Sequence, residues 1–193
     1  MAKSSIKNIE NQLTVARKET LIQLRDAFDS NGVKFLPGAG VTLKDDGVAV
    51  YQGRGATTAL YENIYTTAQT AHDREVCILG LDEAFSSLTD GMTIIQDHVA
   101  RLTRAGICER ILVCEGDTTF VNVPSSYRWL PRQYFSRTSP VYLFGDKLAF
   151  HTGNLRRRTT VIEDRHLTHH LKKIFNLLWD TAIIPPGAEA RSP

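Results

Sequence analysis

The sequence predicts an α/β domain with a mixed sheet flanked by helices, preceded by a long N-terminal helix. Three observations lead to this class. Segments with the apolar pattern of strands alternate with segments of helical period over residues 33–114. A two-residue hairpin signal, Gly145-Asp146, joins two later strand patterns and adds antiparallel pairing. An amphipathic helical pattern runs from about Ser4 to Ser30.

The N-terminal pattern predicts one continuous helix. Asn31-Gly32 supplies its stop signal. At 1.5 Å per residue such a helix spans roughly 40 Å, whereas a domain of this size has a radius of gyration of about 15 Å. We therefore expect it to overhang its own domain and to pair with the same helix of a second chain, although an ordinary core helix is the alternative. The residues expected at this homodimer contact are Ile6, Ile9, Leu13, Leu24 and Phe28.

The alternation that follows predicts strands with parallel pairing. The expected elements are strands at Val33–Leu36 and Val48–Tyr51, a helix after Gly53-Arg54-Gly55, a strand at Glu75–Leu81, a helix from an N-cap at Asp90 to Ala105, and a strand at Arg110–Cys114. The first of these helices has a clear apolar face, formed by Ala56, Leu60, Ile64, Ala68 and Ala71.

The second half begins with a proline-containing loop over residues 115–140. The elements expected after it are strands at Val141–Phe144, Lys147–His151 and Thr159–Ile162 and a helix from about Asp164 to Thr181. The core stripe expected on that helix comprises Leu167, Leu171, Ile174 and Leu178, with Phe175 and Trp179 on one flank. The predicted organisation is a helix at 1–31, an α/β domain at 32–182 and a disordered tail at 183–193.

Composition favours a soluble, cytoplasmic protein. Hydrophobic residues make up 42% and charged residues 23%, and no apolar run reaches the ~18 residues of a membrane span. The polar N-terminus does not resemble a signal peptide. Cys77, Cys108 and Cys114 lie in apolar, strand-like contexts without C-x-x-C spacing, which predicts reduced, buried thiols.

Charge is unevenly distributed along the chain. Residues 32–125 carry seven basic and twelve acidic side chains, whereas residues 126–193 carry eleven basic and five acidic ones. A basic C-terminal third can orient an anionic partner or favour self-association, but two halves of one packed domain can also complement each other.

Three stretches carry a resemblance to a known family. They are Val50–Ala56, a strand, glycine and helix start; Val141–Phe150, a hairpin; and Val161–Asp164 followed by a helix that ends in Ile174–Asp180. Over roughly residues 48–181 the chain resembles the C-terminal effector domain of TrmB-like, sugar-specific transcriptional regulators. The resemblance implies a phospholipase-D-like fold and a role in transcription regulation. Members of the family carry a winged helix-turn-helix before this domain; this chain has one helix there, so DNA binding does not follow from the resemblance.

The phospholipase D motif, H-x-K with an Asp shortly after the Lys, is not intact. Only His170 has a Lys two positions on, Lys172, and the position of the motif's Asp is Leu177. His170 also falls inside an amphipathic helix. Covalent phosphodiester cleavage needs a nucleophile held by an orienting partner, and the sequence pattern offers no such pair. We therefore expect a protein that is not an enzyme.

Three histidines in the last predicted helix bear on metal binding. His166 and His170 are four residues apart and lie on one side of the helix, where two imidazoles could share a zinc ion with a third ligand. His169 points to the opposite, solvent face. The pattern favours solvated or locally hydrogen-bonded histidines, and we predict no metal and no cofactor.

Several basic and aromatic residues are candidates for ligand contacts. Arg54 lies between two glycines ahead of a helix, where free backbone N–H groups can bind an anion, although the pattern favours a simple turn that leads into the helix. Arg156, Arg157 and Arg158 form a loop that could grip phosphate or remain solvated. The segment with mixed aromatic and basic side chains could stack a sugar or a base, or could plug the core; its candidates are Tyr127, Arg128, Trp129 and Arg132.

The sequence thus predicts a non-catalytic ligand-sensing or regulatory domain that binds a small ligand such as a sugar and acts through self-association or a partner. One alternative is a nucleic-acid-binding protein that uses the basic C-terminal third. A second is a protein-interaction module built on the long helix. No feature points to a membrane partner.

Overall fold

The computed structural model divides the chain into two compact units, Met1–Asp46 and Gly47–Pro193. The structure describes residues 6–7, 9, 11, 13–30, 33–36, 40–43, 47–53, 55–135, 139–152 and 158–188. The unit boundary therefore falls later than the expected division after residue 31, because a β-hairpin accompanies the N-terminal helix.

The N-terminal unit contains helix α2 (Lys18–Ser30) and an antiparallel hairpin of β1 (Val33–Leu36) and β2 (Gly40–Leu43). Strand β2 was not expected. The prediction of one continuous helix from Ser4 is wrong, because residues 13–17 are not helical. Thr14 and Val15 lie in this break, and β-branched side chains lose χ1 freedom in a helix. The single stripe of roughly 40 Å is therefore not formed.

The larger unit is built on one seven-stranded mixed sheet in the order β3-β9-β8-β7-β4-β5-β6. Its strands are β3 (Val48–Gln52), β4 (Glu75–Leu79), β5 (Cys108–Cys114), β6 (Tyr127–Leu130), β7 (Val141–Phe144), β8 (Lys147–Thr152) and β9 (Arg158–Glu163). Strand β5 pairs in parallel with β4 and with β6, and all other pairs are antiparallel. The carboxyl ends of β4, β5 and β6 consequently meet at one edge of the sheet.

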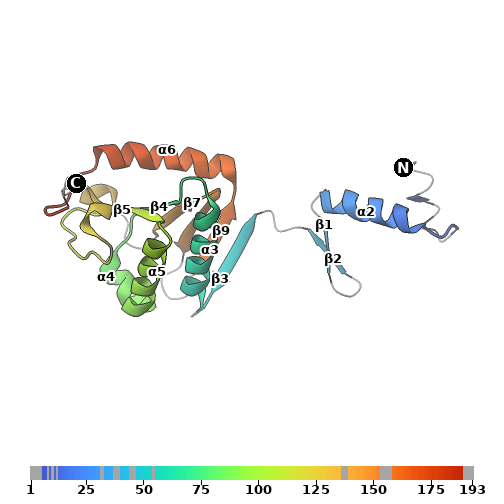
Figure 1. Ribbon diagram of the computed structural model, residues 1–193, viewed down its shortest axis with the longest axis horizontal. Helices are drawn as coiled ribbons and strands as arrows, with labels where there is room; N and C mark the ends of the chain where they lie inside the picture. Colours follow the sequence, from blue (N-terminus) through green and yellow to red (C-terminus); the bar gives the residue numbers. More distant parts are fainter. Residues whose placement is uncertain are drawn as a thin grey trace. The chain divides into compact units, whose positions relative to one another are not determined.

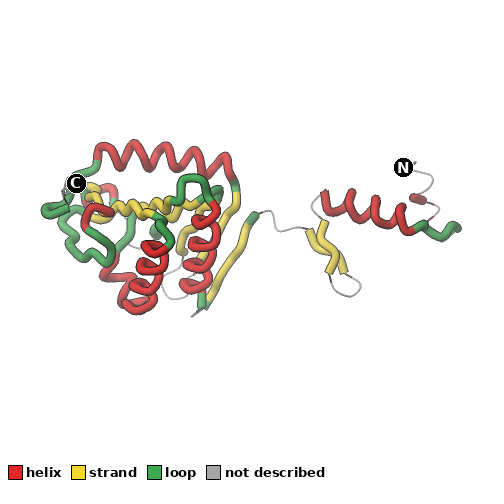
Figure 2. Tube along the Cα trace, in the orientation of Figure 1, coloured by secondary structure: helices red, strands yellow, loops and turns green. Residues whose placement is uncertain are grey.

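Helices cover both faces of this sheet (Figures 1 and 2). Helices α3 (Ala56–Thr70) and α5 (Met92–Arg104) pack on one face, over a core that includes Leu60, Ile64 and Leu102. Helix α6 (Arg165–Thr181) packs on the other face and contacts β4, β7 and β8. The expected alternation of strands and helices and the Gly145-Asp146 hairpin are confirmed.

The helical path before α5 begins earlier than predicted. Helix α4 (Glu83–Ser86) leads through a π-helical turn (Ser87–Gly91) into α5. The N-cap is Asp82, whose side chain accepts a hydrogen bond from the Phe85 amide at 2.8 Å. Asp90 is not the cap; its carboxylate instead accepts from the Thr57 hydroxyl at 2.8 Å.

The face of helix α6 that packs on the sheet is rotated from the predicted one. Leu171 and Leu178 pack against the core as expected. Thr168, Phe175 and Trp179 are buried as well, whereas Leu167 and Ile174 are 40% and 42% exposed. The aromatic rings take the central position because they bury more area and because the Arg110 guanidinium of β5 lies over both of them, 5.1 Å from the Phe175 centroid and 5.4 Å from that of Trp179.

The segment after α6 is ordered as far as residue 188, contrary to the predicted disordered tail. Ile183 pairs with Trp129 of β6 through two backbone hydrogen bonds, and Ala188 is buried. Residues 189–193 lie outside the described residues.

Candidate ligand-binding cleft

Two parallel strands end side by side at the carboxyl edge of the sheet, where ligand sites of open α/β sheets form. After β4, the amides of Gly80 and Leu81 both donate to the Leu112 carbonyl, at 2.9 and 3.3 Å. After β5, the chain turns at Gly116, where the amide of Asp117 donates to the Cys114 carbonyl. Gly80 and Gly116 have φ near +80°, a conformation that favours glycine.

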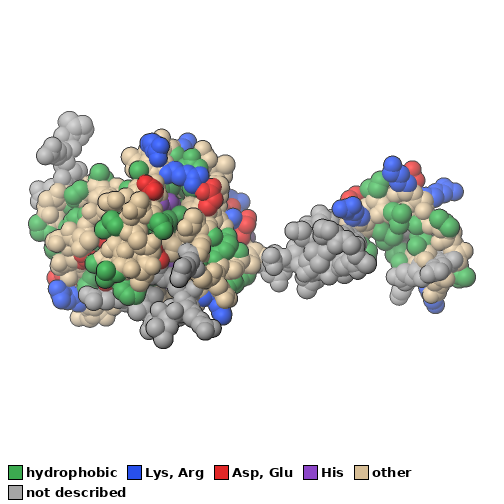
Figure 3. Space-filling model, turned by 90° about the horizontal axis from the view of Figure 1, so that it is seen from below, with side chains coloured by type: hydrophobic (Ala, Val, Ile, Leu, Met, Phe, Trp, Pro, Cys, Tyr) green, Lys and Arg blue, Asp and Glu red, His purple; other side chains and the backbone are tan. Residues whose placement is uncertain are grey.

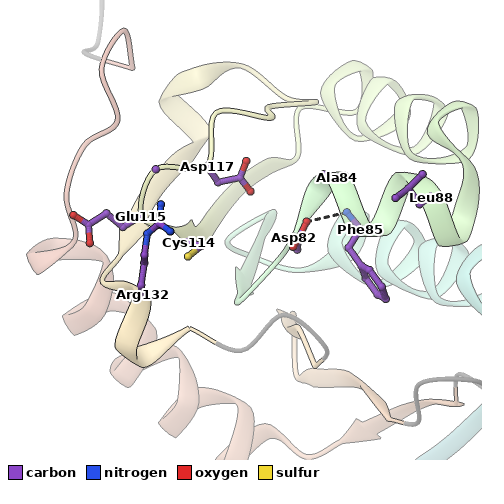
Figure 4. Close-up of a pocket in the computed structure, with 9 residues that line it drawn as sticks. Asp82, Ala84, Phe85, Leu88, Cys114, Glu115, Asp117 and Arg132 are labelled. Atoms are coloured by element: carbon purple, nitrogen blue, oxygen red, sulfur yellow. Dashed lines mark hydrogen bonds between the residues drawn. The ribbon is translucent and has the colours of Figure 1, made fainter.

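Between these two strand ends lies a cleft of about 400 Å³, a volume within the range of small-molecule sites. Figure 4 shows its two walls. One wall is the start of the helical segment after β4, and the other is the turn after β5 together with Arg132. The lining residues are Asp82, Ala84, Phe85, Leu88, Cys114, Glu115, Gly116, Asp117 and Arg132.

The helical wall combines one polar and two apolar groups. Asp82 is buried and held in place by its cap hydrogen bond to Phe85. Phe85 is 38% exposed and Leu88 is 87% exposed. This wall therefore offers an accessible apolar surface beside a fixed carboxylate.

The opposite wall is fixed by hydrogen bonds to Asp117. Its carboxylate accepts from the Thr119 amide at 2.9 Å, and its carbonyl accepts from the Trp129 indole N–H at 2.7 Å. Figure 4 shows the Asp117 carboxylate turned toward the wall that carries Asp82, whereas Glu115 points away. The interior of the cleft is consequently acidic.

Arg132 supplies the positive charge in this lining. Its guanidinium lies directly against Gly116, since a Cβ at that position would be 2.9 Å from Nη2. A side chain at position 116 would therefore displace Arg132 as well as strain the turn. Of the four aromatic and basic candidates from the sequence, Arg132 is the one that lines this cleft.

The other three candidates lie on β6, where a loop was expected. Tyr127 is buried in the core, with its hydroxyl bound to Glu83. Arg128 points to the α6 face, where its guanidinium donates to the Trp179 carbonyl and lies over the Trp179 ring. Trp129 is half-buried and anchors Asp117. Alternation along a strand explains these opposite directions, and none of the three side chains lines the cleft.

Of the arginine candidates for anion binding, Arg158 is exposed at the start of β9, paired with Gln52 and Thr152. Arg54, Arg156 and Arg157 lie outside the described residues. On the face shown in Figure 3, basic and acidic side chains of the larger unit are interspersed.

The residues expected at a dimer contact do not share one helix face. Ile6 and Ile9 are half-buried helical residues, Leu13 is 74% exposed in the non-helical break, and Leu24 and Phe28 lie on α2. The expectation of a homodimer itself is untested by these positions.

The histidines and cysteines have varied surroundings. His166, His169 and His170 are exposed on α6. Among the residues that the structure describes, no group of three or more side chains is arranged to hold a metal ion. Of the three free cysteines, only Cys77 is buried; Cys108 is exposed and Cys114 is half-buried in the cleft wall, so the prediction of three buried thiols is wrong.

Sequence reasoning missed most of the cleft. The residues predicted for a site do not include Asp82, Phe85, Leu88 and Asp117. Asp82 nevertheless carries the signal of an N-cap, because it follows a buried strand and precedes a short helical pattern. Asp117 carried no signal of its own, because its role depends on Trp129, twelve residues further along the chain.

The larger unit has the mixed α/β sheet with helices on both faces that the sequence predicts. No protein-family model matches the chain, and no curated protein matches its sequence.

Solved structures do match it. The chain is similar to TrmBL2, an archaeal chromatin protein, with 13% identity and a TM-score of 0.46 over 95% of this chain and 67% of that one. It is similar to Nuc, a phospholipase D family member from Salmonella typhimurium, with 13% identity and a TM-score of 0.47 over 70% and 96%. It is similar to NucT from Helicobacter pylori, with 8% identity and a TM-score of 0.50 over 72% of this chain and 98% of that one. The likeness to NucT concerns the fold alone.

In the part of the chain that the structure describes, no helix is both long and apolar enough to cross a membrane.

Proposed function

We propose that the chain is a regulatory, ligand-sensing domain that binds a small neutral polyol such as a sugar in the cleft at the carboxyl edge of the sheet. The observation that carries this proposal is the pairing of an acidic interior with an accessible apolar wall. The cleft places Asp82 and Asp117 opposite each other, with Phe85 and Leu88 beside them.

The chemistry of the lining favours hydroxyl groups over phosphate. Ionised carboxylates only accept hydrogen bonds, and sugar hydroxyls donate them. Two carboxylates directed to its interior, those of Asp82 and Asp117, against the one guanidinium of Arg132 make the cleft unfavourable for an anion. The Phe85 ring offers the apolar surface on which the C–H face of a sugar ring can pack.

The lining does not combine a nucleophile with a base. Cys114 is its one nucleophilic side chain, and no histidine is among the lining residues. Thiol catalysis needs a neighbouring base or a strongly electropositive setting. This supports binding without turnover, in line with the broken phospholipase D motif.

A thermal-shift screen of the full chain against neutral mono- and disaccharides tests the proposal. A ligand that binds only the native state at a hundredfold excess over its Kd adds about 2.7 kcal/mol of stability, so the melting temperature should rise. Asp117→Asn keeps the shape of the side chain but removes its charge and should abolish most of the rise. Asp180→Asn, on the exposed face of α6 and outside the lining, is the matched control.

A sugar that stabilises the unmodified chain and the Asp117→Asn variant equally would place its binding elsewhere. If no neutral sugar stabilises the chain while a nucleic acid does, the alternative of a nucleic-acid-binding protein is favoured instead.

A further inference from the structure

A second cleft, of about 610 Å³, lies at the other edge of the sheet. Its walls are the C-terminal end of α3, the turn between β7 and β8, the end of β9 and the first turns of α6. Strand β4 begins just after Asp73, which lines this second cleft, and ends at the first one. The two clefts are therefore separated by the length of the central strands and can bind different ligands.

Two lysines in this second cleft are already neutralised. The Lys172 ammonium lies 2.6 Å from the Asp73 carboxylate, and the Lys147 ammonium lies 3.6 Å from that of Glu163. Lys147 also donates to the Asn63 side chain at 3.2 Å. Both lysine side chains are mostly buried, at 15% and 21% exposure, so they form fixed walls.

Arg165 and His169 have no such partners. They are four residues apart on α6, which places them one above the other on the same side of the helix, and both line the cleft. Within the described residues, neither forms a hydrogen bond or an ion pair, and both are exposed. Their donors are available to a ligand.

Two amides at the start of helix α6 are already used. The Leu167 amide donates to the Asp164 carboxylate at 3.0 Å, and the Thr168 amide donates to the Asp164 carbonyl at 2.9 Å. The side chains of Arg165 and His169 are therefore the donors considered for an anion.

The permanent charges of the cleft are balanced. Asp73, Asp146 and Glu163 face three cations, namely Lys147, Arg165 and Lys172. Because Lys147 and Lys172 are paired with Glu163 and Asp73, Arg165 is the cation of this lining that is left for a ligand.

We propose that this second cleft binds a small molecule that carries a phosphate group. The Arg165 guanidinium, whose fork matches two phosphate oxygens, and a ring N–H of His169 hold the phosphate. Asp146, the acid left without an ion-pair partner among the described residues, accepts a hydrogen bond from a hydroxyl or amine elsewhere on the ligand. The proposal goes beyond the sugar cleft and does not depend on it.

Calorimetric titration of the full chain with inorganic phosphate tests this. Sulfate, an anion of similar size and shape, serves for comparison, and we expect both anions to bind. Arg165→Gln should raise the Kd of phosphate by about tenfold, because the guanidinium fork is lost. His169→Gln should also weaken binding, because a flexible amide replaces the rigid ring donor.

His166→Gln is the matched control, because His166 is exposed on the same helix but does not line the cleft. It should leave the Kd unchanged, and the response of the first cleft to sugars should survive in Arg165→Gln. Absence of phosphate binding overturns the proposal, as does weakening by His166→Gln that equals the weakening by Arg165→Gln.

Two further measurements separate the sources of phosphate. Binding of phosphatidic acid vesicles without binding of free phosphate overturns the proposal of a small ligand. Displacement of phosphate by a short DNA duplex, with affinity that falls steeply with salt, assigns the surface to nucleic acid and overturns it as well.

Discussion

Tyr127 of β6 donates a hydrogen bond to the Glu83 carboxylate of α4, with 2.6 Å between the oxygens, and both side chains are almost completely buried. The Tyr127 hydroxyl also accepts from the amides of Val121 and Asn122, at 3.1 and 2.9 Å. The Asn122 side chain in turn donates to the Glu109 carboxylate at 2.7 Å. A buried polar ladder thus ties helix α4, at the first cleft, to strands β5 and β6.

The second oxygen of Glu83 has no hydrogen-bond partner among the described residues. It lies at a cavity of about 20 Å³ that Tyr61, His98 and Glu109 also line. A cavity of this size can hold one water molecule. Burial is the main cause that raises the pKa of Glu83 and favours its protonated form, against the hydrogen bond from Tyr127, which lowers this pKa.

Tyr127→Phe tests how much this ladder contributes to stability. The variant removes the donor to Glu83 and leaves two backbone amides without their acceptor. The free energy of unfolding should fall by about 1–3 kcal/mol, the cost of unsatisfied buried groups. Urea denaturation measures the change. Tyr134→Phe, at a side chain that is 74% exposed, should have almost no effect; a similar loss in both variants would show that the ladder is not responsible.

The pH dependence of stability should reveal two opposed titrations. Burial raises the pKa of Glu109 to about 7. The hydrogen bond from Asn122 lowers this pKa, and the nearby charge of Glu83 raises it. Between about pH 4.5 and 7 the folded chain therefore binds more protons at Glu109 than the unfolded chain does. Stability from this group is present below that range and is lost as the pH rises, by up to about 3 kcal/mol.

His98 acts in the opposite direction. It is buried and stacked on Tyr61 with 3.9 Å between ring centroids, and burial lowers its pKa to about 4. The unfolded chain then binds more protons at this site, and stability from His98 is lost as the pH falls from about 6.5 to 4. The two effects nearly cancel in the unmodified chain.

Single variants should separate them. In Glu109→Gln only the His98 effect remains, so the free energy of unfolding should increase with pH between about 4 and 6.5. In His98→Gln only the Glu109 effect remains, so the free energy of unfolding should decrease as the pH rises from about 4.5 to 7. Urea denaturation across this pH range provides the measurement. Parallel pH profiles in the two variants would contradict the assignment of opposite protonation states to these side chains.

The elements that could be predicted are those whose local sequence pattern agrees with their packing in the fold. The amphipathic α3 and the hairpin at Gly145-Asp146 follow local rules, and both occur as expected. The face of α6 was not predictable from leucine spacing, because Arg110, distant in sequence, draws Phe175 and Trp179 to the sheet. Local patterns specify that a helix is amphipathic, but contacts from distant strands decide which residues of a wide apolar face are buried.

The site was less predictable than the fold. Arg132 was a candidate, but Tyr127 and Trp129 serve the core and its edge. Aromatic and basic residues in a proline-flanked segment suggested a ligand-contacting loop, whereas pairing with β5 turns residues 127–130 into a strand. The cleft arises where two strands end side by side, and that adjacency is a property of the sheet topology.

Phosphodiester turnover should be absent. His170, the one histidine followed two residues later by a lysine, is exposed on α6 and belongs to neither cleft lining. Incubation with a chromogenic phosphodiester should give no product above that of a buffer control. Turnover that disappears in His170→Ala would contradict this and would place a nucleophile on the helix.

Nucleic-acid binding, if it occurs, should depend on the basic segment at 156–158. Replacement of Arg156, Arg157 and Arg158 by alanine should weaken DNA or RNA binding and reduce its salt dependence, because fewer counterions are released. Fluorescence anisotropy with labelled duplexes at several salt concentrations measures both quantities. Replacement of Arg17 and Arg25 in the N-terminal unit removes similar charge and serves as the control. No binding at about 50 mM salt would eliminate this alternative.

Self-association through the N-terminal unit remains our prediction, with α2 in place of the longer helix. Leu21, Leu24 and Phe28 share one side of α2 by their spacing, and Leu21 and Phe28 are 53% and 47% exposed. A short helix with a two-stranded hairpin buries little apolar surface by itself. Exposed apolar area costs about 25 cal/mol per Å², which favours pairing with the same surface of a second chain.

Leu21→Glu combined with Phe28→Glu should convert a dimer into a monomer, because the added carboxylates of both chains would be buried at the contact. Light scattering at micromolar concentrations measures the mass, and Gln23→Glu, exposed on the same helix, controls for added negative charge. A monomer mass for the unmodified chain would contradict self-association. A dimer that persists in the double variant would place the contact outside α2.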